Sequence, residues 1–349
     1  MRALIYSLLY LLRIHNLFRF INRRKVTILM YHGFTDFNND PLLLNHQGKH
    51  LNIKKFKKQM IYLNKKYNII SMTQLIELFS NGSKIPDYSA VITIDDGYKS
   101  NYKLAFPVIN ELKIPVIIFP LTSPVNDRKL LWIDRLEYAL LRTQKKSINL
   151  KIGARNYKFD LGSRYNKMVN GRSIRILVKS IKQDELDKYL DQLIDELDVD
   201  LMKEEKIPNI YQILEWDEII EMIESGLVTI GSHTHSHYNL KNCDVEIINN
   251  ELLLSKKLIE NKTKKECLYF SYPHGKKRSF SELTKELLKK TDYKCALTTE
   301  PGMNDGTSDI FKLKRYSVSN NDSFHGFVYL LCGAREKLSK LKNTFHFNS

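Results

Sequence analysis

Residues 90–97 read Ala90-Val91-Ile92-Thr93-Ile94-Asp95-Asp96-Gly97, an apolar run that ends in two carboxylates and a glycine. A short apolar run rich in β-branched residues is typical of a buried strand in a parallel sheet. Adjacent side chains at a strand end point in different directions. One carboxylate can therefore bind a cation while its neighbour accepts a proton from water. Gly97 permits a tight turn after the strand.

Similar apolar runs recur along the chain, with helical periodicity between them. The predicted strands are residues 26–33, 90–94, 115–119, 227–230, 269–272 and 295–298, and the predicted helices are residues 52–67, 71–79, 98–112, 216–225 and 281–290. Strands and helices alternating at this spacing imply a parallel sheet, so the fold class is α/β. Several such units in succession predict a distorted (β/α)7-type barrel with its site at the C-terminal ends of the strands.

The barrel is predicted over residues 26–330, but the pattern changes between about residues 131 and 209. There the sequence predicts a turn at Trp132-Ile133-Asp134, a helix, a hairpin over Ile148–Leu161 and a lysine-rich, acidic helical stretch. We expect this part to be an insertion in the barrel rather than a separate domain. Residues 331–349 are expected to form a basic, helical C-terminal tail.

Residues 1–25 combine a short apolar run with Arg13, Arg19 and the basic run Arg23-Arg24-Lys25. The uncharged stretch from Ala3 to Leu12 is too short to span a bilayer. No small-residue cleavage site follows it, as a signal peptide would require. One interpretation is an amphipathic basic helix that lies on an anionic membrane surface. The alternative is an ordinary amphipathic helix packed on the barrel.

The chain has 55 Lys and Arg residues against 39 Asp and Glu residues, which gives a formal net charge of +16. Such a molecule attracts polyanions, anionic lipid head groups or phosphate-bearing substrates. The lysines lie mostly in mixed stretches such as residues 255–265 and 284–294, which resemble solvated helix faces. No nucleic-acid-binding motif accompanies them. We therefore expect no nucleic-acid partner.

A second polar motif, His233-Thr234-His235-Ser236-His237, follows a later predicted strand. Its outer histidines are four residues apart and can place both imidazoles on one face if the loop forms a helical turn. With Asp96 they would complete a set of two histidines and one carboxylate that leaves positions open for water and substrate. This set suits Zn²⁺ first, and also Co²⁺, Ni²⁺, Mn²⁺ or Fe²⁺. Asp95 would then act as a base toward water activated by the cation, which predicts acyl hydrolysis.

The order of these segments resembles the polysaccharide deacetylase family, carbohydrate esterase family 4 with its NodB homology domain, over roughly residues 26–319. Thr93-Ile94-Asp95-Asp96-Gly97 matches the family's Thr-Phe-Asp-Asp-Gly motif except for Ile in place of Phe. His233-Thr234-His235-Ser236-His237 matches its His-Ser/Thr-x-x-His motif in full. The resemblance implies that Asp95 is the catalytic base and that Asp96, His233 and His237 are metal ligands.

Two helper residues of the family have no clear counterpart. The family's Arg-x-x-Pro-Tyr/Phe-Gly motif is matched only in part by Phe270-Ser271-Tyr272-Pro273-His274-Gly275, which lacks the arginine that orients the base. The late histidine that protonates the leaving amine is missing from residues 311–318. The chain resembles a subgroup that also lacks it. The acid is then expected to be His32 or His274, unless Asp95 and metal-bound water perform both proton transfers.

The same resemblance implies a set of substrate-binding residues. They come from the leading Tyr-His, the Trp-Ile-Asp element, the third motif and the late Leu-x-Arg: Tyr31, Trp132, Asp134, Tyr272, Pro273, Gly275 and Arg315. The backbone N–H of His274 would help to hold an oxyanion.

Together these features predict a metal-dependent hydrolase that removes the N-acetyl group from an amino sugar in a glycan. The basic surface and residues 1–25 favour a lipid-linked saccharide, modified at the cytoplasmic face of a membrane. The four widely spaced cysteines are compatible with a reducing cytoplasm. A secreted or periplasmic peptidoglycan or exopolysaccharide deacetylase is the first alternative. A catalytically impaired carbohydrate-binding scaffold is the second.

Overall fold

A parallel sheet in the order β12-β1-β5-β6-β9 forms the centre of the molecule, and β4 pairs with β5 beside this path. The structure is a computed structural model that describes residues 2–37, 48–201 and 208–335. The strands are β1 (Thr27–Tyr31), β4 (Asn68–Ile69), β5 (Ser89–Asp96), β6 (Val116–Pro120), β9 (Val228–Ile230) and β12 (Tyr316–Ser317). The strand predicted at residues 90–94 is β5, all of whose residues are buried. It pairs in parallel with both β1 and β6.

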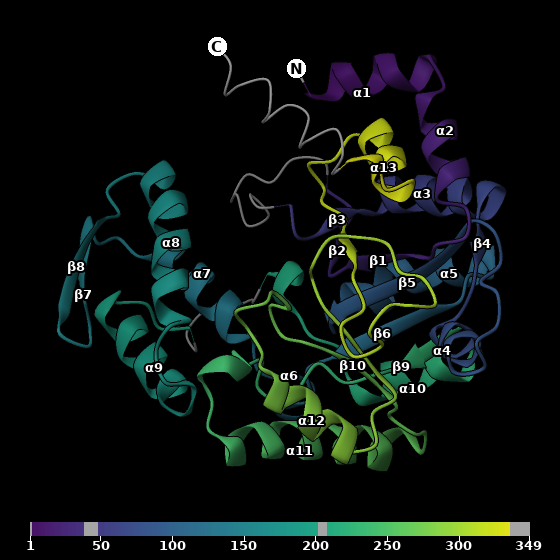
Figure 1. Ribbon diagram of the computed structural model, residues 1–349. Coiled ribbons are helices and arrows are strands. Elements are labelled where there is room, and N and C mark those ends of the chain that lie inside the picture. The colour runs from purple at the N-terminus through teal and green to yellow at the C-terminus, as the bar shows by residue number, and fades with distance from the viewer. Residues whose placement is uncertain (1, 38–47, 202–207, 336–349) are drawn as a thin grey trace.

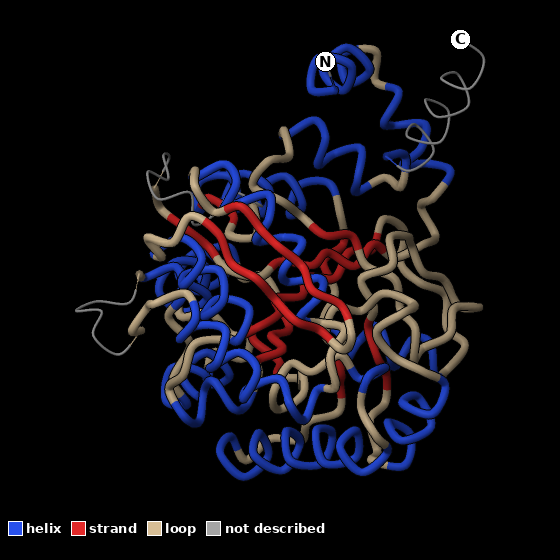
Figure 2. Tube along the Cα trace, turned by 90° about the vertical axis from the view of Figure 1, so that its left-hand side faces the viewer, coloured by secondary structure: helices blue, strands red, loops and turns tan. Residues whose placement is uncertain are grey.

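Short contacts close this sheet into a barrel. β10 (Tyr269–Ser271) pairs in parallel with β11 (Cys295–Leu297). Parallel bridges join Ser232, just after β9, to Phe270, and Leu297 to Leu313, just before β12. Because β12 pairs with β1, the strands follow one another round a ring. This confirms the predicted distorted (β/α) barrel, whose strands lie inside a layer of helices in Figure 2.

Helices cover the outside of the barrel. They are α3 (Ile53–Lys66), α4 (Met72–Ser80), α5 (Phe106–Leu112), α6 (Thr122–Asp127), α10 (Trp216–Glu224), α11 (Val245–Thr263) and α12 (Glu282–Lys290). The helix predicted from Tyr98 begins differently, with a π-helical turn at Asn101–Ala105 ahead of α5. Two side chains at the start of this turn form hydrogen bonds with the loop after β1. Asn101 Nδ2 donates to the His32 carbonyl, and Ser100 Oγ accepts from the Phe34 N–H. The turn therefore fastens the loop after β1.

The insertion forms a lobe beside the barrel, at the left of Figure 1. It contains α7 (Trp132–Arg142), the antiparallel hairpin of β7 (Ser147–Ile152) and β8 (Arg155–Asp160), α8 (Arg164–Val178) and α9 (Leu186–Glu196). Its side chains, among them Leu136, Ile174 and Leu190, form an apolar cluster of their own. The predicted hairpin is present, whereas the predicted turn at Trp132 is the first turn of α7. Helix α8 was not predicted.

The N-terminal segment forms two helices instead of the single amphipathic helix predicted over residues 1–25. They are α1 (Arg2–Leu11) and α2 (Ile14–Ile21), and they are separated by Arg13, whose φ of 56° interrupts the helical path. One face packs on α13 (Phe324–Leu331), where Tyr6 stacks on Tyr329 and Tyr10 on His325. This contact matches the alternative in which the segment docks on the barrel.

The opposite face of α1 and α2 is exposed. Its exposed large apolar side chains are Ile5, Leu8, Leu11, Leu17, Phe20 and Ile21, and Leu12 between the two helices is also exposed. Among the described residues, no helix has the length and apolarity needed to cross a membrane. The predicted basic tail over residues 331–349 falls largely on residues 336–349, which lie outside the described residues.

Candidate metal centre

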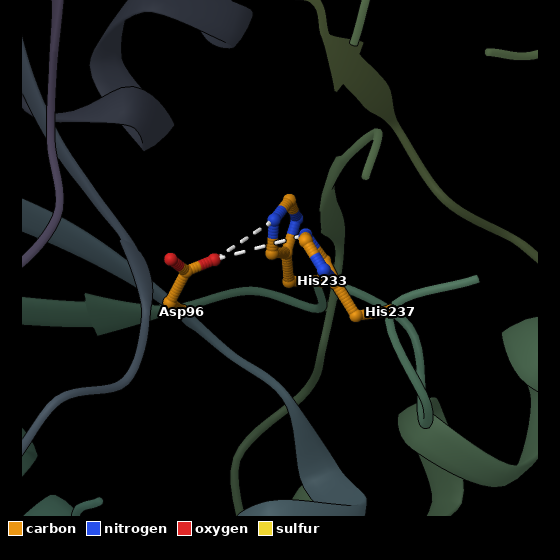
Figure 3. A group of neighbouring side chains, drawn as sticks. All are labelled: Asp96, His233 and His237. Atoms are coloured by element: carbon orange, nitrogen blue, oxygen red, sulfur yellow. Dashed lines mark ion pairs between the residues drawn. The ribbon is translucent and has the colours of Figure 1, made fainter. Parts of the chain in front are cut away.

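Asp96, His233 and His237 converge at the C-terminal end of the barrel strands. Asp96 Oδ1 lies 3.4 Å from His233 Nε2 and 3.8 Å from His237 Nε2. Candidate ligand atoms of the three residues all lie within 4.8 Å of one another, and all three residues are buried. Figure 3 shows the carboxylate facing the two imidazole rings. The structure thus brings together the three residues predicted as ligands.

The backbone at the site adopts conformations that most side chains avoid. Asp96 has a φ of 74°, Thr234 of 73°, His237 of 61° and His274 of 61°. Left-handed conformations at residues other than glycine are uncommon and tend to cluster at functional sites. The histidine loop does not form a helical turn, the geometry that we considered for placing both imidazoles on one face. Its shape comes from hydrogen bonds such as that from the His237 N–H to Thr234 Oγ1.

Residues around the histidine loop hold the imidazoles in place. His233 Nδ1 lies 2.7 Å from the Ser271 carbonyl oxygen, which leaves Nε2 to face Asp96. Glu251, a buried residue of α11, accepts hydrogen bonds from the backbone N–H groups of His235 and Ser236 at 2.9 and 2.8 Å. Burial raises the pKa of Glu251, and these N–H groups oppose the shift. Such outer contacts commonly orient metal-binding histidines.

Asp95 is held by Arg315, which follows β11 and immediately precedes β12. Nη1 of Arg315 lies 2.8 Å from Oδ1 of Asp95, and Nη2 lies 2.7 Å from Oδ2. The guanidinium also donates to Thr93, Ser271 and Thr298, so each of its five N–H groups has an acceptor. Burial alone would raise the pKa of Asp95, but Arg315 overcomes this effect and lowers it. The arginine missing from the third motif is thus replaced by one from another strand.

Asp96 pairs with Lys49, which no part of the sequence argument singled out. Lys49 Nζ lies 2.8 Å from Asp96 Oδ2, the oxygen that does not face the imidazoles. Burial would raise the pKa of Asp96, but Lys49 and His233 hold it well below its usual range. Burial lowers the pKa of His237 well below its usual value. The native site therefore contains an ionised carboxylate beside a neutral His237 ring.

A cavity of about 230 Å³ lies over this centre. Both candidate acids line it: burial lowers the pKa of His32, and burial followed by Lys179 lowers that of His274 well below its usual value. Tyr272 also lines the cavity, although its hydroxyl donates to the Phe311 carbonyl.

The other residues predicted to bind substrate do not line the cavity. They are Tyr31, Trp132, Asp134, Pro273, Gly275 and Arg315. Tyr31 is buried and donates its hydroxyl hydrogen to Gln59, and Trp132 Nε1 donates to the His237 carbonyl at 3.4 Å. Asp134 is buried and accepts from Tyr98. A direct substrate contact by Arg315 is contradicted by its complete burial behind Asp95.

Three cationic residues of the cavity wall were missed. Lys49 precedes β3 (Leu51–Asn52), and Arg175 and Lys179 lie near the end of α8 in the insertion. No motif marks them, because they lie on segments that reach the site only through tertiary packing. The sole sequence signal was the spacing of Arg175 and Lys179, which are four residues apart and so share a helix face.

The donor set suits a divalent cation. A carboxylate oxygen and two imidazole nitrogens are ligands that Zn²⁺ and its neighbours accept, and three protein ligands leave room for water and substrate. His237 Nδ1 is buried and has no hydrogen-bond partner among the described residues. The residues therefore fit the group that the sequence predicts.

The fold and the site define a (β/α)-barrel protein with two histidines and one carboxylate at the mouth of the barrel. The sequence model of the polysaccharide deacetylase family matches residues 176–296. The chain is 32% identical over 111 residues to the Bacillus subtilis (strain 168) protein YxkH, whose name assigns it provisionally to the polysaccharide deacetylases. It is 31% identical over 68 residues to the poly-beta-1,6-N-acetyl-D-glucosamine N-deacetylase of Escherichia coli (strain K12).

These alignments cover 32% and 20% of the chain, and they span only 38% and 9% of the lengths of the two relatives. Solved structures extend the likeness at the level of the fold. Deacetylase PplD of Streptococcus pyogenes aligns with a TM-score of 0.57 and 15% identity over 88% of this chain and 98% of that one. IcaB of Ammonifex degensii aligns with a TM-score of 0.57 and 16% identity over 88% and 97%. The chain is thus related to the polysaccharide deacetylase family, as its motifs predicted.

Proposed function

We propose that the protein is a metal-dependent hydrolase that removes the N-acetyl group from an amino sugar of a glycan. One observation carries the proposal: a carboxylate held by a buried arginine stands beside Asp96, His233 and His237 at one cavity. The match of residues 176–296 to the polysaccharide deacetylase family also supports hydrolysis of an N-acetyl group. An inactive scaffold would have no need for a buried Asp95–Arg315 pair, since an uncharged pair in its place is often as stable.

Asp96, His233 and His237 would hold the cation. When bound, a divalent cation supplies Lewis acidity toward the amide carbonyl and the attacking water. Asp95 accepts the proton of that water. Its Oδ2 accepts from Arg315 and Ser271, whereas Oδ1 accepts only from Arg315 among the described residues. The open acceptor position is therefore on Oδ1. The proton that Asp95 has taken up then passes to the leaving amine, either directly or by way of His32 or His274, two rings of the cavity wall whose pKa burial lowers.

The test measures bound metal and acetate release with the same protein samples. Acetate is measured from lipid-linked, polymeric and small acetamido sugars, and metal by elemental analysis. Asp95→Asn should keep the metal and lose at least about 10²-fold in turnover, because general base catalysis typically supplies that much. His237→Ala should lose the metal. His235→Ala is the matched control, because His235 does not belong to the ligand set and should keep both. Wild type that binds an acetamido glycan but releases no acetate would establish the scaffold alternative.

The finer part of the proposal concerns the substrate, which we propose to be linked to a membrane lipid. Six exposed apolar side chains of α1 and α2, together with Leu12 between the helices, support it, because apolar side chains flanked by basic residues suit an anionic membrane surface. Arg13, Arg24 and Lys25 lie among or directly after them and are exposed. The protein then works at the cytoplasmic face of a membrane. A periplasmic or extracellular location is the alternative that cell fractionation would reveal.

Surface substitutions test membrane contact better than removal of residues 1–25, because removal would also uncover α13. Leu8→Glu and Leu12→Glu change exposed side chains only. We expect both to reduce flotation with vesicles that contain phosphatidylglycerol, without reducing hydrolysis of a small soluble acetamido sugar. Val245→Glu, at an exposed apolar residue of α11, is the matched control. Equal flotation of all three variants and the wild type would refute membrane contact through this face.

A further inference from the structure

The cavity over the metal centre has a wall that the barrel does not supply. Arg175, in the last turn of α8, and Lys179, directly after this helix of the insertion, line it together with His274. Two cationic side chains that share one cavity repel each other, and burial removes the water that would screen them. A deacetylase acting on a neutral acetamido group has no evident use for them.

Of the two residues, Lys179 has less opposite charge nearby to offset this repulsion. Its Nζ lies 3.0 Å from His274 Nδ1, and no carboxylate lies within ion-pair distance of it among the described residues. Burial, followed by the charges of Arg175 and Lys49, lowers the pKa of Lys179 to about 7. The ammonium form is therefore destabilised in the free protein. An anion bound beside it would remove that penalty.

Among the described residues, no carboxylate pairs with Lys179 to provide this anion. Glu137 pairs with Arg175, whose Nη1 lies 4.0 Å from Glu137 Oε2, and burial, followed by Asp134, raises the pKa of Glu137 to about 7. Asp95 is already paired with Arg315, and Asp96 with Lys49. Lys276 adds a further positive charge near Lys179. A cation at the metal centre would make this part of the cavity still more positive.

We propose that Arg175 and Lys179 form a subsite for an anionic group, a phosphate or a carboxylate, carried by the acetamido sugar that the metal centre deacetylates. The inference rests on the proposed function and narrows it to acidic substrates. Lysine and arginine bind both groups through charge-assisted hydrogen bonds. A phosphate would come from a sugar linked through phosphate to a lipid or nucleotide, and a carboxylate from a uronic acid.

The test compares three small probes: N-acetylglucosamine, N-acetylglucosamine 1-phosphate and N-acetylglucosaminuronic acid. We expect wild type to have a higher kcat/KM for at least one anionic probe than for the neutral one. Lys179→Met and Arg175→Met should each lower the ratio of anionic to neutral kcat/KM at least tenfold, which corresponds to about 1.4 kcal/mol. Lys179→Arg should preserve the ratio. Lys188→Met, which removes an exposed lysine of the same insertion, is the control and should also preserve it.

Calorimetric binding to Asp95→Asn protein separates this inference from the proposed function. If wild type releases no acetate, the proposed function fails, while tighter binding of an anionic probe that is lost in Lys179→Met still supports the subsite. Preference for the phosphate or for the carboxylate probe identifies the source of the anion. Equal affinity for neutral and anionic probes, or equal ratios in Lys179→Met and Lys188→Met, would overturn the inference.

Discussion

Replacement of Arg315 by methionine should destabilise the protein more than the loss of almost any other single charge. Arg315 has no exposed surface, and its guanidinium makes a bidentate ion pair with the buried Asp95. Arg315→Met leaves that carboxylate charged and unpaired in the protein interior. Breaking a buried pair in this way typically costs about 3–5 kcal/mol of unfolding free energy. We expect a loss in that range near neutral pH.

Urea unfolding of metal-free protein measures this cost. Lys57→Met is the control, because Lys57 pairs with Glu111 at the surface, where such a pair is worth about 1 kcal/mol or less. The double variant Arg315→Met/Asp95→Asn should recover about 2 kcal/mol or more of the loss, since no charge then remains buried. A loss below about 1 kcal/mol in Arg315→Met, or one that Asp95→Asn does not reduce, would refute the reasoning.

The cost should also depend on pH in a defined direction. In the wild type the pKa of Asp95 is lowered, so its stabilisation is present above the pKa of the unfolded chain and is lost as pH falls through the native pKa. In Arg315→Met the main effect that opposes burial is removed and only those of His233 and His32 remain, so we expect burial to raise the pKa of Asp95 and the variant to lose stability as pH rises. The difference between the two proteins should therefore widen from about pH 4 to about pH 7. A constant difference would show that Asp95 is not the origin of the cost.

Three further predictions follow from the surroundings of the site. Glu251→Ala should weaken metal binding about 10–100-fold by freeing the histidine loop, whereas Glu246→Ala, at an exposed residue of the same helix, should not; metal titration of both variants decides this. Gly97→Ala should lower the melting temperature more than Gly82→Ala, because both residues have positive φ but only at Gly97 would the added Cβ meet another side chain, that of Pro120 at 2.9 Å. Burial raises the pKa of Glu137 to about 7, so the neutral carboxyl stabilises the fold at low pH, and this stabilisation is lost as pH rises through about 7. The glutamine of Glu137→Gln does not ionise. Between pH 5 and pH 8 the free energy of unfolding of this variant, measured in urea, should therefore gain up to about 3 kcal/mol relative to wild type.

The sequence predicts those site residues that end or directly follow a short buried strand. Asp95 and Asp96 end an apolar run, and a run of that kind is buried whatever the rest of the fold does. His233 and His237 follow another short strand, β9. Parallel strands deliver their C-terminal ends to one face of a barrel, so the convergence of these four residues follows from local pattern and topology together.

The remainder depends on contacts between segments that are distant in sequence. Arg315 lies 220 residues from the carboxylate that it holds, and only closure of the barrel through β12 brings the two together. The late Leu-x-Arg pattern marked this arginine, but no local property distinguishes a residue that binds substrate from one that holds the base. Arg175 and Lys179 were missed because the insertion packs as its own apolar cluster, and its orientation is not encoded in the periodicity of α8.

The charges of the centre would allow one site to combine a base with the cation and the acidic substrate that we propose. Asp95 and Asp96 carry two negative charges, which ion pairs with Arg315 and Lys49 compensate. Burial keeps the His237 ring neutral, so the charge of a bound divalent cation would be largely uncompensated. Such a cation is bound less tightly than one between several free carboxylates, but it acts more strongly on the atoms that it touches. The same excess of positive charge, extended by Arg175 and Lys179, would attract the anionic sugar that we propose as the substrate.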